Sequence, residues 1–214
     1  VIIGPSGCGK TVLLRHIIGL LKPDRGRLLI DKVDLNALNN VELNRFRQKF
    51  GMLFQNAALF DSMNVYENIA FPLKEHTKMD EAKIAKIVEE KLSLVGLEGI
   101  QKKMPADLSG GMRKRVGLAR AIALEPEIIL YDEPTTGLDP IMTEAIDNLI
   151  LEMQRQLKVT SIVISHDIPS SFRIADQISM VYKGKIIESG TPDDFRKSTH
   201  EAAQEFLRKG EGKG

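Results

Sequence analysis

The sequence opens with "VIIGPSGCGKT", residues Val1–Thr11, and this stretch decides the fold class. Its last eight residues fit the pattern G-x-x-x-x-G-K followed by Ser or Thr, in which glycines let main-chain N–H groups approach phosphate oxygens. Three strand-like apolar residues precede the loop, and the helix-like run "KTVLLRHIIGLL" follows it. A helix directs the positive end of its dipole at a bound anion. The stretch therefore predicts the phosphate-binding loop of a P-loop NTPase.

Within this loop, two side chains have predicted roles. Lys10 is expected on the β and γ phosphates of a nucleotide, and Thr11 is expected to place its hydroxyl on Mg²⁺. The alternative is a Gly-rich turn with no ligand, but the strand and helix patterns on either side favour the nucleotide site. Cys8 is predicted to be a small filler side chain of the loop, since a lone thiol has no redox partner. The predicted nucleotide contacts are Gly4, Pro5, Ser6, Gly7, Cys8, Gly9, Lys10 and Thr11.

Composition restricts the class of protein. The 214 residues suffice for one sizeable core with a subdomain, and the formal net charge of +1 provides no strong attraction to nucleic acid or to an anionic membrane. The absence of Trp argues against stacking platforms for single-stranded nucleic acid, so no nucleic-acid partner is predicted. The single cysteine excludes an internal disulfide and suits a reducing cytosol. No apolar run reaches the ~20 residues that cross a bilayer.

The order of apolar segments indicates an α/β fold. Strand-length blocks alternate with helical patterns, which predicts a mostly parallel sheet flanked by helices. Helices are expected over residues 81–96, with Asp80 as N-cap and Gly96 as stop, over 109–123, and from Pro140 onward. Residues 73–125 contain no strong strand and are predicted to form an inserted helical subdomain, with 1–72 and 126–214 forming the core. The predicted strands are "VII", "RLLI", "FGMLF", "EIILYD", "TSIVIS", "QISMVY" and "GKIIES".

Two acids end the run "IILYDEP", which is apolar without alternation, as a strand buried on both faces should be. Asp132, at the carboxyl end of this strand, is placed to hold the Mg²⁺ shell, and Glu133 follows it immediately. Adjacent residues point to opposite faces, so one acid can serve the metal while the other addresses water. The alternative, two acids that merely end a strand at the surface, is disfavoured by the phosphate-binding loop upstream.

The stretch "LSGGM", residues 108–112, predicts a second anion site. Ser109, Gly110 and Gly111 at a helix start present main-chain N–H groups and the helix dipole. Alone the signal is weak, because Ser109 could simply be an N-cap. The cations that follow are predicted to form a solvated basic helix face, as isolated charge runs usually do. They are Arg113, Lys114, Arg115 and Arg120.

Taken in order, "GPSGCGKT", Gln55, "LSGGM", "IILYDEP", "GLDP" and "SHD" closely resemble the motifs of the ATP-binding cassette (ABC) ATPases over nearly the whole chain. The resemblance implies ATP and Mg²⁺, a RecA-like core, and a head-to-tail dimer in which the signature residues 109–111 close over ATP held by the second copy. It implies that Gln55 touches Mg²⁺ or the attacking water. It also implies that Glu133 is the general base, that Asp139 communicates across the dimer, and that His166 meets the γ-phosphate, so that Glu133, His166 and Lys10 are catalytic. In this family further strands and an adenine-stacking aromatic precede the loop, so the sequence is expected to be truncated at its N-terminus.

Met112 stands where the signature usually ends in Gln, and this departure points to a subfamily. The segments "MLFQNAALFDSMNVYENIAFPLKEHT" and "LSGGMRKRVGLARAIALEPEIILYDEP" look most like the lipid-asymmetry (Mla-type) ATPases. That resemblance implies peripheral attachment to the cytoplasmic face of the bacterial inner membrane. It also implies a membrane permease for phospholipid trafficking and lipid-binding accessory subunits. Methionine-importer ATPases are the alternative. Residues 56–77 are predicted to form either an apolar groove for a permease helix or ordinary core.

Other classes fit less well. A soluble small-molecule kinase would share the phosphate loop but has no use for "LSGGM". A chromosome-maintenance or repair ATPase shares all the motifs but would insert long heptad repeats, which this chain lacks. Translation factors of the same superfamily carry two cassettes in one chain, whereas this chain has one.

Overall fold

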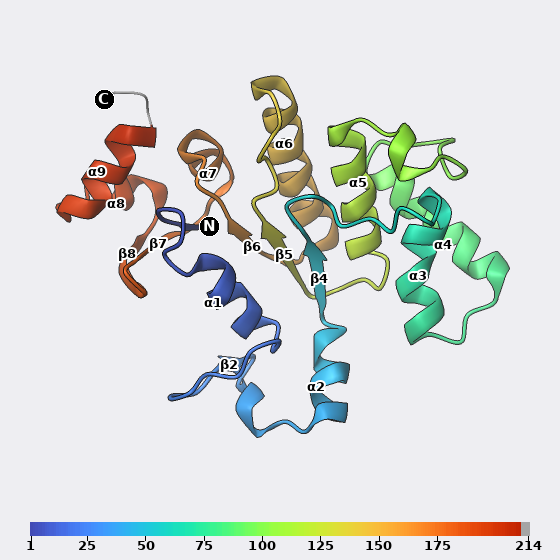
Figure 1. Ribbon diagram of the computed structural model, residues 1–214, viewed down its shortest axis with the longest axis horizontal. Helices are drawn as coiled ribbons and strands as arrows, with labels where there is room; N and C mark the ends of the chain where they lie inside the picture. The colour runs from blue at the N-terminus through green and yellow to red at the C-terminus, as the bar shows by residue number, and fades with distance from the viewer. Residues whose placement is uncertain (211–214) are drawn as a thin grey trace. The chain divides into compact units, whose positions relative to one another are not determined.

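The computed structural model describes residues 1–210, and the chain forms two compact units (Figure 1). One unit comprises residues 1–50 and 162–214, and the other comprises residues 51–161. The predicted helical subdomain, 73–125, lies within the second unit. The last four residues of the predicted core segment 126–214 lie outside the described residues. The division of the chain at residues 73 and 125 stays a prediction.

The first unit holds a sheet with the strand order β6-β1-β7-β8, where β6 (Thr160–Ile164) runs across the boundary of the two units. Strand β1 (Ile2–Ile3) is parallel to β6 and to β7 (Ile178–Tyr182), and Ile2 is in register with both Ile164 and Ser179. Strand β8 (Lys185–Gly190) is antiparallel to β7. The predicted mostly parallel sheet is thus observed, and β1 lies in its interior.

Helices cover this sheet because their apolar residues share one core with the strands. A buried cluster joins Ile3 of β1 and Met180 of β7 to Phe195 of α8 (Pro192–Arg196). Phe206 and Leu207 of α9 (Glu201–Gly210) pack against the same cluster. The remaining elements of this unit are α1 (Lys10–Ile17), β2 (Leu29–Ile30), β3 (Val33–Asp34), η1 (Leu35–Ala37), α2 (Asn40–Arg47) and α7 (Ile168–Ile174).

The hairpin of β2 and β3 is only half predicted by the sequence. "RLLI" indicated β2, but β3 was not expected. The connecting residues Asp31 and Lys32 have φ values of 48° and 67°. Two consecutive positive φ angles characterise the type I′ turn, whose twist matches that of a hairpin but whose usual residues are Asn and Gly. An Asp-Lys pair carries no such signal.

The second unit is richer in helix. Its helices α3 (Val65–His76), α4 (Glu81–Leu94) and α5 (Gly110–Ala121) pack together in the part of the chain coloured green in Figure 1. As predicted, the Asp80 side chain accepts a hydrogen bond from the Lys83 amide, and Gly96 follows α4 with a φ of 67°. The other elements are β4 (Phe50–Leu53), η2 (Pro105–Asp107), β5 (Ile128–Asp132), α6 (Pro140–Leu157) and the start of β6.

The apolar segment 56–77 contains both buried and exposed side chains. Val65 and Ile69 are completely buried, as core residues are. Phe60 is 42% exposed, and its ring lies 5.0 Å from the half-buried ring of Phe71. Val65 and Ile69 therefore belong to the core, and a groove for a permease helix at Phe60 and Phe71 stays a prediction. None of the helices in residues 1–210 is long and apolar enough to cross a membrane.

A buried amide fixes the loop before α3. Asn68 is fully buried, and its Oδ1 accepts a hydrogen bond from the Phe60 amide at 2.8 Å. Its Nδ2 donates to the carbonyls of Phe60 and Met63 at 3.1 and 2.9 Å. A buried polar group that loses its partner costs about 1–3 kcal/mol. The single side chain thus anchors the turn that carries the exposed Phe60.

We expect Asn68→Leu to lower the free energy of unfolding by about 3 kcal/mol, since it removes the side-chain partner of the part-buried Phe60 amide and Met63 carbonyl. Urea denaturation followed by circular dichroism measures the change. Asn148→Leu, at an exposed position of α6, is the matched control and should change it by no more than about 0.5 kcal/mol. Equal effects of the two substitutions would show that Asn68 does not anchor this loop.

Candidate functional site

The predicted phosphate-binding loop runs from the end of β1 to the first turn of α1. Gly9 is the N-cap of α1 with a φ of 105°, and Gly7 has a φ of 75°. L-amino acids with a side chain avoid this left-handed region, so glycine is required by the backbone here. The loop therefore has the strand–loop–helix setting that the motif needs.

Gly4 is constrained by a neighbouring strand as well as by its φ of 148°. A Cβ atom at Gly4 would lie 2.2 Å from the carbonyl oxygen of Val181 in β7 and 3.0 Å from Sγ of Cys8. Real Cβ atoms do not approach a backbone oxygen so closely, and a backbone atom cannot swing aside. The loop can therefore leave β1 at this point only with a glycine, and the half-buried Cys8 fills space beside it, as predicted.

Lys10 is 7% exposed and folds back over its own loop. Its Nζ donates hydrogen bonds to the carbonyl oxygens of Gly4 at 2.8 Å and Pro5 at 3.0 Å. A buried ammonium group needs acceptors, and these two carbonyls supply them. Phosphate oxygens are stronger acceptors for an ammonium group, so this cradle fits an anion at the N-terminus of α1.

His166 lies at the same sheet edge as this loop. The Ser165 amide donates to the Ile2 carbonyl at 3.1 Å, so the ends of β6 and β1 lie side by side. His166 is exposed, and Asp167 caps α7 by accepting from the Ser170 amide. Parallel strands bring their carboxyl ends to one edge, which is where α/β sheets bind ligands. The first unit thus brings His166 and the loop from Gly4 to Thr11 to one edge, and the role of His166 at a nucleotide remains a prediction.

In the second unit, Asp132 ends β5, whose other residues are buried, as predicted, and Glu133 follows the strand directly. Glu133 has a φ of 51°, which is unusual for a residue with a side chain. The Thr136 hydroxyl donates to Oε2 of Glu133 at 3.1 Å, and the Thr136 amide donates to the Glu133 carbonyl at 3.3 Å. A strained backbone held in place by its surroundings is typical of functional sites.

The predicted solvated basic face on α5 is wrong for Lys114, whereas Arg113 is exposed. Lys114 is only 6% exposed, and its Nζ donates to the carbonyls of Pro134 and Thr136, the latter at 2.9 Å. Burial lowers the pKa of Lys114 to about 8, although the negative charge of Glu133 acts in the opposite direction. Arg113, Arg115 and Arg120 also donate to main-chain carbonyls, at Leu108, Val95, and Ala57 and Ala58.

The helical spacing of α5 indicates that Lys114 is buried, although the charged residues beside it in the sequence suggest that it is exposed. Lys114 lies three residues after Gly111 and three before Gly117, and both glycines are buried on α5. A lysine in the middle of a buried stripe is expected to be buried too. The side chain was assigned to solvent because its neighbours in sequence are charged.

A cavity of about 270 Å³ in the second unit is bordered by two of the predicted site residues. Gln55 and Gly110 both line it, together with residues that sequence reasoning did not assign to a site.

Asp139 and Ser109 each cap a helix. Asp139 caps α6 by accepting from the Met142 amide at 3.0 Å, and Ser109 caps α5 by accepting from the Met112 amide at 3.3 Å. A Cβ at Gly111 would lie 2.1 Å from Cε of Met142. The residues that line the 270 Å³ cavity are Gln55, Asn56, Gly110, Arg113, Lys114, Thr136, Gly137 and Leu138.

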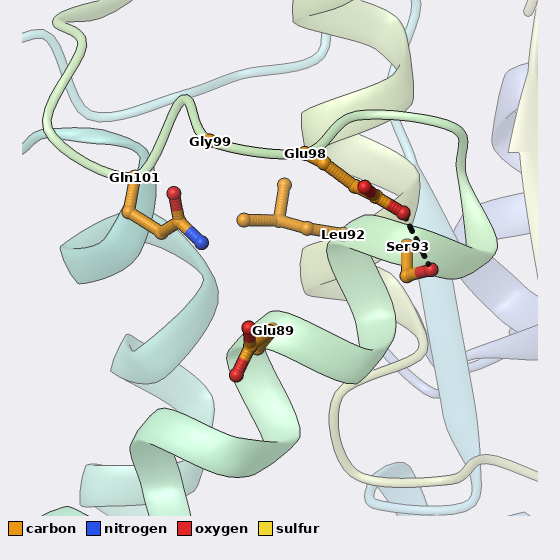
Figure 2. Close-up of a pocket in the computed structure, with 6 residues that line it drawn as sticks. All are labelled: Glu89, Leu92, Ser93, Glu98, Gly99 and Gln101. Carbon is orange, nitrogen blue, oxygen red and sulfur yellow. Dashed lines mark hydrogen bonds between the residues drawn. The ribbon is translucent and has the colours of Figure 1, made fainter.

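A second cavity, of about 560 Å³, lies between α4 and the segment that follows it (Figure 2). The Glu89 and Gln101 side chains border it, and the Ser93 hydroxyl donates to Glu98 at 3.2 Å. None of the predicted site residues lines this cavity.

The predicted Mg²⁺ ligands are a hydroxyl, an amide and a carboxylate, from Thr11, Gln55 and Asp132. All three carry oxygen donors, which Mg²⁺ prefers. Among residues 1–210, no group of three or more His, Cys, Asp or Glu side chains is placed to share a metal ion. The metal role of these three residues stays a prediction.

Comparison with known proteins agrees with the motif order. The probable ribonucleotide transport ATP-binding protein mkl of Mycobacterium leprae is 46% identical over 207 residues, which are 97% of this chain and 60% of that protein. The intermembrane phospholipid transport system ATP-binding protein MlaF of Haemophilus influenzae is 46% identical over 213 residues, which are 100% of this chain and 80% of that protein. The chain thus spans less than two thirds of the length of the mycobacterial relative.

Solved structures give the same result. The structure of cbiO1 from Clostridium perfringens, part of the ABC transporter complex cbiONQ, has a TM-score of 0.85 at 32% identity and covers 97% of this chain and 80% of its own. The ATP-binding cassette MJ0796, in a dimeric post-hydrolysis state bound to ADP and phosphate, has a TM-score of 0.80 at 33% identity. The match covers 89% of this chain and 84% of the MJ0796 chain. These solved structures confirm the P-loop NTPase fold, and the identity to the MlaF proteins confirms the resemblance to Mla-type ATPases. Since residues 1–136 also match the family model for ABC transporters, the chain belongs to the ABC transporter family.

Proposed function

We propose that this chain is the ATP-hydrolysing subunit of an ABC transporter that energises phospholipid trafficking. The observation that carries the proposal is the loop from Gly4 to Thr11, whose glycines and Lys10 form an anion cradle at the carboxyl end of β1. Its fit to a triphosphate is supported by the relative MJ0796, whose solved structure is described as bound to ADP and phosphate.

The proposed nucleotide site assigns one task to each residue. Lys10 exchanges its two carbonyl acceptors for β and γ phosphate oxygens, and the amides of the loop add further hydrogen bonds. His166, which follows β6 beside the loop, meets the γ-phosphate. Mg²⁺, held by Thr11, Gln55 and Asp132, would neutralise charge on the β and γ phosphates.

Hydrolysis is proposed to use Glu133 as the general base. The Glu133 carboxylate accepts a proton from a water molecule, while the water oxygen bonds to the γ-phosphorus. The bond from the γ-phosphorus to the β–γ bridging oxygen breaks, which releases ADP and phosphate. The hydrogen bond from Thr136 to Oε2 of Glu133 would orient the carboxylate before water arrives.

Two copies are proposed to act together, with Ser109, Gly110, Gly111 and Asp139 facing ATP held by the partner copy. Dimeric solved structures of MJ0796 support this arrangement. The permease is proposed to contact the exposed Phe60 and the half-buried Phe71, which lie in the segment after Gln55. We further propose that the chain lies at the cytoplasmic face of the inner membrane, attached through this permease.

The cargo has two candidates among the relatives. The MlaF relatives from Haemophilus influenzae and Escherichia coli K12 are described as phospholipid transport proteins, and the mycobacterial relative as a probable ribonucleotide transport protein. We favour phospholipid because the chain covers 80% of the Haemophilus protein but 60% of the mycobacterial one. Affinity purification from native membranes, with identification of the permease and of bound lipid, tests this. Co-purification of a permease without phospholipid, together with ATP hydrolysis that ribonucleotides stimulate, would favour ribonucleotides as the cargo.

Glu133→Gln should lower kcat for ATP hydrolysis by about 10²–10⁴-fold and leave ATP affinity unchanged, because an amide cannot take the proton from water. Steady-state hydrolysis and calorimetric titration measure the two quantities, and light scattering should show an ATP-bound dimer. Glu144→Gln, at an exposed position of α6, is the control and should behave like the unmodified protein. Near-normal hydrolysis by Glu133→Gln would rule out Glu133 as the base.

Ser109→Glu should abolish ATP-dependent dimerisation, since a carboxylate at the start of α5 would face the γ-phosphate of the partner's ATP. Monomer affinity for ATP should be retained, because Ser109 is not a proposed contact of the ATP bound by its own copy. Light scattering with and without ATP, in the Glu133→Gln background, measures dimerisation. Ser62→Glu, at an exposed loop position, serves as control. Dimerisation equal to that of the control would contradict the proposed signature role.

A further inference from the structure

Lys114 connects α5 to the loop that carries Glu133. We call α5 the signature helix because it begins at the signature residues 109–111. Lys114 lies on α5, about one turn after Gly110, and its Nζ donates to the carbonyl oxygens of Pro134 and Thr136. These two residues flank Thr135 in the turn that directly follows Glu133. One ammonium group therefore fixes two main-chain positions of this turn to one position of the helix.

The same turn determines the direction of the Glu133 carboxylate. Its backbone is strained, with a φ of 51° at Glu133, and it is closed by the hydrogen bond from the Thr136 amide to the Glu133 carbonyl. The Thr136 hydroxyl then donates to Oε2 of Glu133 at 3.1 Å. Since Lys114 holds the carbonyl of Thr136, it fixes the residue whose side chain orients the carboxylate.

Stability alone does not account for a lysine at this position. Burying an ammonium group disfavours its charged form, and the lowered pKa of Lys114 reflects that cost. Lys91 of α4 shows the usual solution in this unit: it is 2% exposed and forms ion pairs with Glu90 and Glu125, both at 3.1 Å. The hydrogen bonds of Lys114 go instead to main-chain carbonyls of the catalytic turn.

We propose that Lys114 is a positioning residue that keeps the Glu133 carboxylate in its reactive orientation and makes that orientation depend on the place of the signature helix. The inference rests on the proposed role of Glu133 in ATP hydrolysis. A shift of α5 when the signature residues 109–111 meet a nucleotide would move the turn after Glu133 through Lys114. Binding of a nucleotide at residues 109–111 would in this way change the orientation of the Glu133 carboxylate.

The test is Lys114→Met, which keeps an unbranched side chain of similar length but removes the ammonium group. We expect kcat for ATP hydrolysis to fall by about 10²-fold, since small misplacements of a catalytic group cost this much, while KM and ATP affinity stay within a factor of about two. Lys114→Arg, whose guanidinium group can donate to both carbonyls, should restore most of kcat. Lys91→Met is the matched control for the loss of a buried cation, and it should lower Tm without changing kcat.

Hydrogen exchange gives a second reading that does not depend on activity. The amides of Thr136 and Leu138, which donate to Glu133 and Thr135, should exchange faster in Lys114→Met and remain unchanged in Lys91→Met. Lys114→Gln replaces Lys114→Met if the latter does not fold. Unchanged kcat, a loss of kcat matched by a loss of ATP affinity, or unchanged exchange at these amides would overturn the proposal. If the unmodified protein does not hydrolyse ATP, the proposed function fails, and faster exchange at these amides would still show that Lys114 holds the turn.

Discussion

Cationic side chains of α5 that donate to main-chain carbonyls hold two irregular loops of the second unit. Lys114 binds the turn after Glu133, and Arg120 binds the carbonyls of Ala57 and Ala58 at 2.8 and 2.9 Å. Ala57 and Ala58 have φ values of 59° and 47°, so this segment after Gln55 is strained as well. Two irregular loops without their own ladders of hydrogen bonds thus obtain partners from one regular helix. Rigid elements position loops in this way at many functional sites.

The phosphate-binding loop of the first unit reaches its conformation by a different route. There the constraint is steric, because Gly4 leaves no room for a Cβ beside Val181, and Gly7 and Gly9 adopt φ values that side chains avoid. The cation at this site, Lys10, belongs to the loop's own helix and binds the loop's own carbonyls. The loop is therefore encoded almost entirely by local sequence, which is why a short motif predicts it.

This contrast explains how far the sequence could predict the molecule. The strand that ends in Asp132, the cap at Asp80 and the strand–loop–helix around Lys10 follow from local patterns, and they are confirmed. Lys114 was assigned to solvent because its contacts lie about 20 residues away in the chain. The positive φ of Glu133 has no residue signal at all, since glutamate does not favour that region. The helical period indicates that Lys114 is buried, but its carbonyl partners and the backbone conformation of Glu133 depend on tertiary contacts, which a single sequence does not show.

The turn after Glu133 combines two features that lower stability. A left-handed φ at a residue with a side chain costs about 1–2 kcal/mol, and a buried ammonium group adds the cost of its desolvation. A glycine at position 133 and an apolar residue at position 114 would remove both costs. Strained backbone of this kind clusters at active sites and ligand clamps, where the surrounding structure holds it in place. The coincidence of the two costs in one turn is therefore an argument, independent of the sequence motif, that this turn performs the chemistry.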